Sequence, residues 1–305
     1  MRCSIAAART SPASEPGHRT PVTAEPRSQL LPVVSVLGSV LSVQFGAAFA
    51  STLFEEVGAS GAVSLRLTIA AIILGVIVRP RWRRWTRTQR EGILALGVAL
   101  AVMNSAFYEA LARLPLGTAV TIEFLGPLTL AAVLSRRLRD GVWVLAALTG
   151  VVMLGLRKNS GAESLDLVGV CFALTAGAAW AGYIVAGSNL AATVPSADGL
   201  AGASIVAAAL TLPLGAVSGG TALFDPRILA VGAAVALLSS VIPYSLELRA
   251  LQVMSKKVFA VLIALEPAAA TLAGVIVLGQ VLGLQSLAAI ALVVAAGVGS
   301  VLSNR

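Results

Sequence analysis

Two acidic residues lie in the middle of long apolar runs of this chain. Glu123 interrupts a run from Leu114 to Ser135, and Glu266 interrupts a run from Val258 to Leu278. About 20 apolar residues span a bilayer as a helix, so both acids fall near a membrane midplane. A carboxylate there costs about 2.5–3.5 kcal/mol on insertion scales and usually faces a cavity or a partner. The chemistry open to Glu123 is the binding of a cationic group, such as a substrate ammonium, or the carriage of a coupled proton. The alternative is a carboxyl group that hydrogen-bonds between helices.

Glu266 lies directly before Pro267. It could share the chemistry of Glu123. The Leu265-Glu266-Pro267 element could equally be a structural helix break, in which the proline, having no N–H, frees a backbone carbonyl. Both interpretations stay open at the level of the sequence.

Asn104 and Tyr108 are four residues apart in one apolar run, so they share a helix face. They could line a cavity, and a hydrogen bond between helices is the alternative. Glu109 and Arg113 are also four residues apart, and we expect them to form a local ion pair.

Tyr244 and Glu247 are three residues apart and follow Pro243 near the end of another apolar run. Arg249 lies only two residues beyond Glu247, and side chains two apart on a helix do not face each other. Glu247 therefore needs a partner elsewhere or an aqueous vestibule, and both residues are candidates for a site.

Arg66 is the single basic residue in the interior of a predicted span. Its planar fork could pair with a substrate carboxylate or with one of the acids. It could also extend outward toward Glu55 or Glu56 in the preceding loop, and we favour this second interpretation. Three weaker cavity candidates, which could equally pack or anchor at an interface, are Gln44, Trp180 and Tyr183.

The composition indicates what kind of protein must position these residues. The 305-residue chain is 57% hydrophobic and 12% charged, with a mean hydropathy of +0.91, whereas soluble domains are about 25% charged. It is therefore predicted to be an all-α membrane protein that crosses the bilayer many times. The net charge of +8 does not indicate nucleic-acid binding, because the basic residues cluster in short segments between apolar runs.

The inventory of metal-binding and redox residues is small. Cys3 and Cys171 are isolated thiols without a disulfide or metal-binding pattern, and the only histidine is His18. We therefore expect no cofactor and no metal, and no histidine is available for catalysis within the membrane.

Ten spans are predicted from Leu31 onward. Their approximate bounds are 31–51, 59–78, 92–111, 115–135, 141–156, 167–187, 199–218, 228–248, 257–278 and 284–302. Residues 1–29 are rich in Ser, Pro, Ala and Arg and are interpreted as a disordered cytoplasmic tail, part of which could lie upstream of the true start. With the N-terminus inside, the cytoplasmic segments hold 17 Lys and Arg residues and the outer segments hold 4. This predicts that both termini are cytoplasmic.

The chain also resembles itself at an offset of 140 residues. This shift places Pro127 on Pro267 and sets each of the first five spans on one of the last five, which divides the chain into repeats at 30–157 and 166–303. Because five is odd, the two repeats must be inverted, and inverted repeats are typical of secondary transporters with sites near the midplane. The same offset pairs Glu266 with Gly126, so the two acids are not equivalent and the site is predicted to be asymmetric.

Two groups of motifs point to a known family. The second half carries Leu265-Glu266-Pro267-Ala268-Ala269-Ala270 and then Leu278-Gly279-Gln280, which resembles the LEP…LGE signature of EamA-type domains. The first half carries Phe107-Tyr108-Glu109-Ala110-Leu111 and Glu123-Phe124-Leu125-Gly126-Pro127-Leu128. Together with Pro243-Tyr244-Ser245-Leu246-Glu247, these motifs resemble the threonine/homoserine exporter branch of the drug/metabolite transporter superfamily.

The resemblance implies ten helices around a central cavity with alternating access. It also implies export of small amino acids or related metabolites across the inner membrane by proton antiport. In this chain Gln280 replaces the usual glutamate of the signature, so the resemblance implies no role for an acid at this position.

Other classes of function fit the sequence less well. No phosphate-binding loop is present, so ATP hydrolysis is not expected. Ser255 and Lys256 adjoin at a loop and do not face each other on a helix, so a Ser–Lys enzyme is not expected either. A membrane scaffold would leave midplane acids in both halves unexplained. A carrier of other metabolites, drugs or lipids on the same fold stays open.

Overall fold

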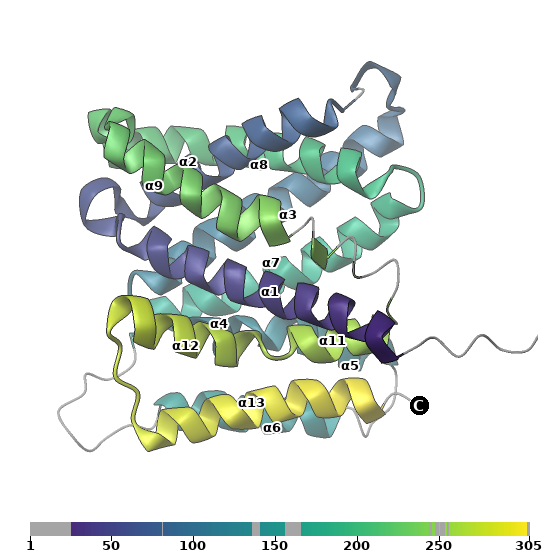
Figure 1. Ribbon diagram of the computed structural model, residues 1–305, viewed down its shortest axis with the longest axis vertical. Helices are drawn as coiled ribbons and strands as arrows, with labels where there is room; N and C mark the ends of the chain where they lie inside the picture. Colours follow the sequence, from purple (N-terminus) through teal and green to yellow (C-terminus); the bar gives the residue numbers. More distant parts are fainter. Residues whose placement is uncertain are drawn as a thin grey trace, which may run out of the picture.

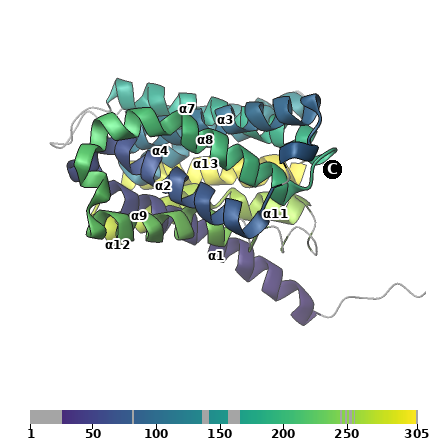
Figure 2. The same ribbon diagram turned by 90° about the horizontal axis from the view of Figure 1, so that it is seen from above.

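The structure is a computed structural model. It describes residues 26–80, 82–135, 141–155, 166–243, 246–247, 250, 254 and 256–303. Within these residues every regular element is a helix, and the helices pack as one bundle in which most run along a common direction (Figures 1 and 2). Residues 1–25 of the predicted tail lie outside the described residues, and the first helix begins at Pro26.

The described helices are named in chain order, in the first half and then in the second. The first half holds α1 (Pro26–Ser51), α2 (Phe54–Val78), η1 (Trp82–Arg84), α3 (Arg87–Leu111), α4 (Leu116–Glu123), α5 (Leu125–Ser135) and α6 (Gly141–Gly155). The second half holds α7 (Leu167–Ala191), α8 (Ser196–Gly219), η3 (Gly220–Phe224), α9 (Pro226–Ala236), the π-helical turn η4 (Leu237–Val241), α11 (Lys256–Ile263), α12 (Glu266–Leu278) and α13 (Leu284–Ser303).

Eight helical segments in the described residues are long and apolar enough to cross a membrane. The fifth and eighth predicted spans coincide with shorter apolar helices, Gly141–Leu154 and Pro226–Val241. The chain is therefore a multi-pass helical membrane protein, and the count of ten spans stays a prediction.

The bounds of the helices follow the 140-residue offset. Adding 140 to the bounds of α1 gives 166–191, and α7 covers Leu167–Ala191; adding 140 to the bounds of α4 gives 256–263, and α11 covers Lys256–Ile263. In both halves the span that carries the midplane acid is interrupted near its centre, at Phe124 between α4 and α5 and at Ala264-Leu265 between α11 and α12.

Local sequence signals set several helix ends. At the start of α3, the Thr86 hydroxyl accepts from the Gln89 amide while the Gln89 side chain accepts from the Thr86 amide, which satisfies two otherwise unpaired donors. The start of α2 differs from the prediction, because the helix begins at Phe54 and not at residue 59. It is interrupted at Gly58, whose φ of +70° suits glycine.

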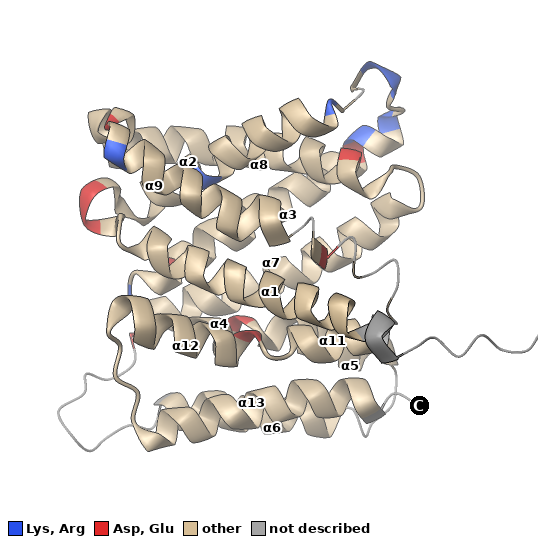
Figure 3. Ribbon diagram, in the orientation of Figure 1, with Lys and Arg blue, Asp and Glu red and all other residues tan. Residues whose placement is uncertain are grey.

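Helices that are far apart in the sequence lie side by side. α2 packs on α8, α3 on α7, α4 on α12, and α6 on α13, so most helices of the first half contact the second half (Figure 1). In Figure 3 most ribbon positions of Lys and Arg lie at the end of the bundle where α1 begins and α13 ends, while those of Asp and Glu occur at both ends and near the middle.

Candidate functional site

A cavity of about 180 Å³ lies between helices of both halves, near the interrupted spans. Its lining includes five of the predicted site residues: Arg66, Asn104, Glu123, Glu247 and Glu266. It also includes the three weaker candidates Gln44, Trp180 and Tyr183. Residues separated by more than 200 positions in the sequence thus meet at one place.

Glu123 and Glu266 enter this cavity from the two interrupted spans. Glu123 is the last residue of α4, and Glu266 is the first residue of α12. The two acids therefore lie on opposite sides of their helix interruptions. This placement is the asymmetry that the 140-residue offset predicts.

The interruption beside Glu123 rests directly against α7. A Cβ built on Gly126 would collide with the Gly177 carbonyl, and a Cβ built on Gly177 would collide with the Glu123 carbonyl. Only residues without a side chain allow this backbone-to-backbone approach. The two glycines thus fix the first-half acid against a helix of the second half.

Arg66 is buried and points into the bundle, so the interpretation that it extends outward toward Glu55 or Glu56 is wrong. Its guanidinium donates from Nη1 to the Tyr108 hydroxyl at 3.3 Å and from Nη2 to the Ser239 carbonyl at 3.4 Å. The arginine that pairs with Glu56 is Arg227, at 3.1 Å.

Arg66 also has the only basic side chain in the cavity lining of the described residues. Its positive charge interacts electrostatically with the carboxyl group of Glu123. The carboxyl groups of Glu123 and Glu247 both interact electrostatically with that of Glu266. The guanidinium carbon lies 5.7 Å from the centre of the Tyr108 ring, a distance at which cation and ring attract each other. The cavity thus has one cationic group and three carboxyl groups.

Asn104 and Tyr108 both lie at the site, although they have different roles. Asn104 lines the cavity, and its side-chain Nδ2 donates to the Leu100 carbonyl at 2.8 Å. Tyr108 is fully buried behind the lining and holds Arg66. Their shared helix face faces the interior, as their spacing predicts.

Glu247 lies at the same cavity and finds its partner on α1. The Ser39 hydroxyl donates to Glu247 Oε1 at 2.5 Å. Ser39 is thus a partner from elsewhere in the fold, which Glu247 needs because Arg249 is too close in sequence to face it. Tyr244, the remaining predicted site residue, lies outside the described residues, as does Arg249.

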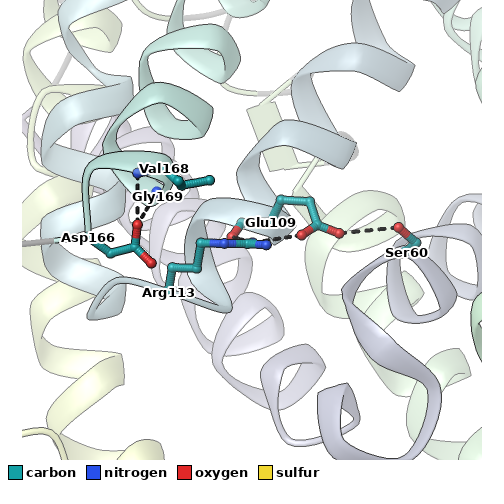
Figure 4. A network of polar contacts seen from close by, with 6 residues as sticks. All are labelled: Ser60, Glu109, Arg113, Asp166, Val168 and Gly169. Atoms are coloured by element: carbon teal, nitrogen blue, oxygen red, sulfur yellow. Dashed lines mark hydrogen bonds and ion pairs between the residues drawn. The ribbon is translucent and has the colours of Figure 1, made fainter.

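A second polar network lies at the carboxyl-terminal end of α3, outside the cavity lining (Figure 4). Arg113 pairs with Glu109 at 2.7 Å, as predicted, and Glu109 also accepts from the Ser60 hydroxyl of α2 at 3.2 Å. Nearby, Asp166 Oδ1 caps α7 by accepting from the amides of Val168 and Gly169. The Ser60–Glu109 bond joins α2 to α3, and with the Arg113 pair it explains Glu109 as a structural residue.

Gln280, the residue that departs from the family signature, has a structural contact. Its Oε1 accepts from the Leu116 amide at 3.1 Å, at the first residue of α4. That amide belongs to the first turn of a helix and has no partner within the helix. Gln280, two residues beyond the end of α12, thus caps the helix that carries Glu123.

Replacing Gln280 tests this cap. We expect Gln280→Leu to lower the free energy of unfolding by about 1 kcal/mol, because a backbone donor loses its partner. We expect Gln280→Glu to keep full stability, because a carboxylate accepts the same bond and suits a helix start. Thermal unfolding of the two purified variants in one detergent measures the difference. Equal stability of the leucine and glutamate variants would contradict the cap.

Sequence reasoning missed two residues of the site. The Ser39 hydroxyl donates a hydrogen bond to Glu247. The Ser239 carbonyl accepts one from Arg66, and Ser239 also lines the cavity. Serine is common in apolar spans of this chain, so neither residue stands out. The π-helical turn η4, which contains Ser239, has no sequence signature either, although such turns are frequent at functional sites.

Comparisons with known proteins identify the family and the fold. A family model described as the EamA-like transporter family matches residues 167–302. A solved crystal structure that is 22% identical superposes with a TM-score of 0.51 over 87% of this chain and 97% of that chain, so the two share the fold.

Relatives with assigned names are more similar. The threonine/homoserine exporter RhtA of Escherichia coli strain K12 is 41% identical over 276 residues, covering 90% of this chain and 92% of that protein. The protein of the same name from Salmonella typhimurium strain LT2 is 42% identical over 277 residues, with the same coverage. With this similarity over nearly the whole chain, the protein belongs to the EamA-like transporter family, in the branch of the threonine/homoserine exporters.

Proposed function

We propose that this protein exports small amino acids, such as threonine and homoserine, by proton antiport with alternating access. The observation that carries the proposal is the cavity that brings Arg66 together with Glu123, Glu247 and Glu266. The names of the relatives, both threonine/homoserine exporters, support the choice of substrate.

The charges of the cavity suit a zwitterion. The guanidinium of Arg66 is held by Tyr108 and by the Ser239 carbonyl, so it is oriented for a carboxylate before any substrate arrives. Glu123 provides an acceptor for the substrate ammonium. One substrate thus satisfies one basic and one acidic side chain.

The coupled proton needs a carboxyl group in the cavity, and Glu123, Glu247 and Glu266 all lie in the lining. A carboxyl group that alternates between ammonium binding and proton binding makes the two exclude each other, which is the requirement for antiport. We assign this exchange to Glu123, because substrate and proton then compete for one group.

The fold supplies a route to alternating access. The 140-residue correspondence of helix bounds supports two inverted five-helix repeats, 30–157 and 166–303, with the site between them. In this arrangement the chain crosses the inner membrane ten times. Both termini are cytoplasmic, and residues 1–29 form a cytoplasmic tail. Rocking of one repeat against the other then opens the cavity to each side in turn.

Counterflow in proteoliposomes tests the function. Purified protein in liposomes loaded with unlabelled threonine should accumulate labelled threonine. In liposomes without internal threonine, an imposed pH gradient should drive net movement of labelled threonine. Liposomes loaded with other metabolites test the alternative of a different small-molecule carrier, and labelled phospholipid tests a flippase. Absence of counterflow with all of these substrates would favour a scaffold and contradict the proposal.

A further inference from the structure

The described part of the chain contains three buried side-chain oxygens that have no hydrogen-bond partner. They are Gln44 Oε1, Thr68 Oγ1 and Ser239 Oγ, and two of these three residues, Gln44 and Ser239, line the cavity. Both residues are 3% exposed. A buried polar atom without a partner costs about 1–3 kcal/mol, and such atoms are rare in folded proteins. Their concentration at the cavity indicates that a ligand supplies the missing bonds.

The two oxygens stand on elements that contact each other. Gln44 is on α1 and Ser239 is on η4. The Ser239 hydroxyl lies over Gly46, where a Cβ would collide with it. The carbonyl of the same serine accepts from Arg66. Ser239 is therefore a direct neighbour of Arg66, the group that is assigned to the substrate carboxylate, and Gln44 lines the same cavity.

We propose that Gln44 and Ser239 form a subsite for a hydroxyl group on the substrate side chain, so that the transporter selects hydroxy amino acids over their apolar isosteres. The subsite rests on the proposed function, whose charged groups hold the two ends of the amino acid. A hydroxyl donates to Gln44 Oε1 and accepts from Ser239 Oγ, so both orphan oxygens become paired by one group. Two other polar side chains of the lining already have hydrogen-bond partners, since Glu247 Oε1 accepts from the Ser39 hydroxyl and Asn104 Nδ2 donates to the Leu100 carbonyl.

The energetic consequence is discrimination against substrates without the hydroxyl. Valine has nearly the shape of threonine, and norvaline has nearly the shape of homoserine, so the apolar member of each pair fits the space. It leaves both oxygens unpaired in a buried site, and a site built around such bonds rejects the isostere strongly. We expect the hydroxy amino acid to be preferred by about 10- to 100-fold in each pair.

Competition in counterflow measures this preference. In proteoliposomes with the wild-type protein, threonine should inhibit uptake of a labelled amino acid at a concentration about 10- to 100-fold lower than valine, and homoserine should do so relative to norvaline. In Gln44→Met and in Ser239→Ala, the ratio should fall to about 3-fold or less, because the apparent affinity for threonine falls while that for valine does not. Thr68→Val is the matched control, since it removes the third orphan oxygen, which lies outside the cavity lining, and its ratio should equal that of the wild type.

Each result decides between the subsite and the function. Transport of threonine and valine with equal preference by the wild-type protein would overturn the subsite and leave amino-acid export standing. A preference that persists in both variants would also overturn it. Failure of the wild-type protein to transport any amino acid would remove the proposed function itself. If a variant folds but is inactive, the ligand-induced shift in its thermal unfolding by threonine and by valine gives the same ratio.

Discussion

Glu123→Gln is expected to abolish the pH-driven movement of threonine while leaving threonine exchange in the absence of a gradient. Glutamine keeps the size of the side chain and can still accept a hydrogen bond from an ammonium, but it cannot take up or release a proton at any relevant pH. In the proposed mechanism Glu123 is the group for which proton and substrate compete. Its neutral analogue therefore uncouples the two without closing the cavity.

The measurement is uptake of labelled threonine into proteoliposomes with and without an imposed pH gradient. Glu91→Gln is the matched control, because Glu91 is an exposed acid that pairs with Arg87 on the surface of α3, and its driven uptake should equal that of the wild type. Driven uptake that is unchanged in Glu123→Gln would show that the coupling assignment is wrong. Loss of driven uptake in Glu266→Gln alone would transfer the role to the second acid.

Arg66→Met should weaken threonine transport by about 100-fold in apparent affinity. Removing one partner of a buried, hydrogen-bonded charge pair costs about 2–5 kcal/mol, and about 2.8 kcal/mol corresponds to 100-fold. Methionine fills much of the same space, so the loss reflects the charge and the planar fork. Arg66→Lys should restore little, because an ammonium does not make the bidentate contact with a carboxylate.

Concentration dependence of threonine counterflow measures this effect. Arg227→Met provides the comparison, since Arg227 pairs with Glu56 of α2 and its side chain is 74% exposed. Exposed ion pairs contribute about 0–1 kcal/mol, so this variant should transport as the wild type does. Equal affinities in Arg66→Met and Arg227→Met would remove Arg66 from the substrate site.

The lining of the cavity could be predicted from the sequence to a large extent. Glu123, Glu266 and Asn104 are conspicuous because polar side chains inside apolar runs are costly and must face the protein interior. That constraint needs no tertiary information. It identifies the cavity-lining side chains without saying what each one contacts.

The partners of these residues could not be predicted, and Arg66 illustrates why. Extension to a nearby acid is the simplest outcome for an arginine in the outer part of a span. The structure instead gives it Tyr108 on α3 and a carbonyl in the π-helical turn η4. Both contacts depend on how helices distant in sequence pack together, and no local pattern of residues encodes that packing.

Helix lengths were predictable only where hydropathy alone sets them. The bounds of α7 follow the apolar run closely. The start of α2 does not, because the residues before Gly58, including polar ones, are also helical, so the helix begins at Phe54. The proline at 267 signals an interrupted helix, but the contact of Gly126 with Gly177 that seats the first interruption is a tertiary feature.

The placement of the two acids at opposite kinds of helix end has an electrostatic consequence. The carboxyl end of a helix carries a partial negative charge and the amino end carries a partial positive charge, because the peptide dipoles align along the axis. Glu123 closes α4, so its charge adds to the negative end of that dipole, whereas Glu266 opens α12 and faces a positive end. A cation in the cavity is thus drawn to the α4 side, and the backbone itself makes two chemically identical side chains unequal.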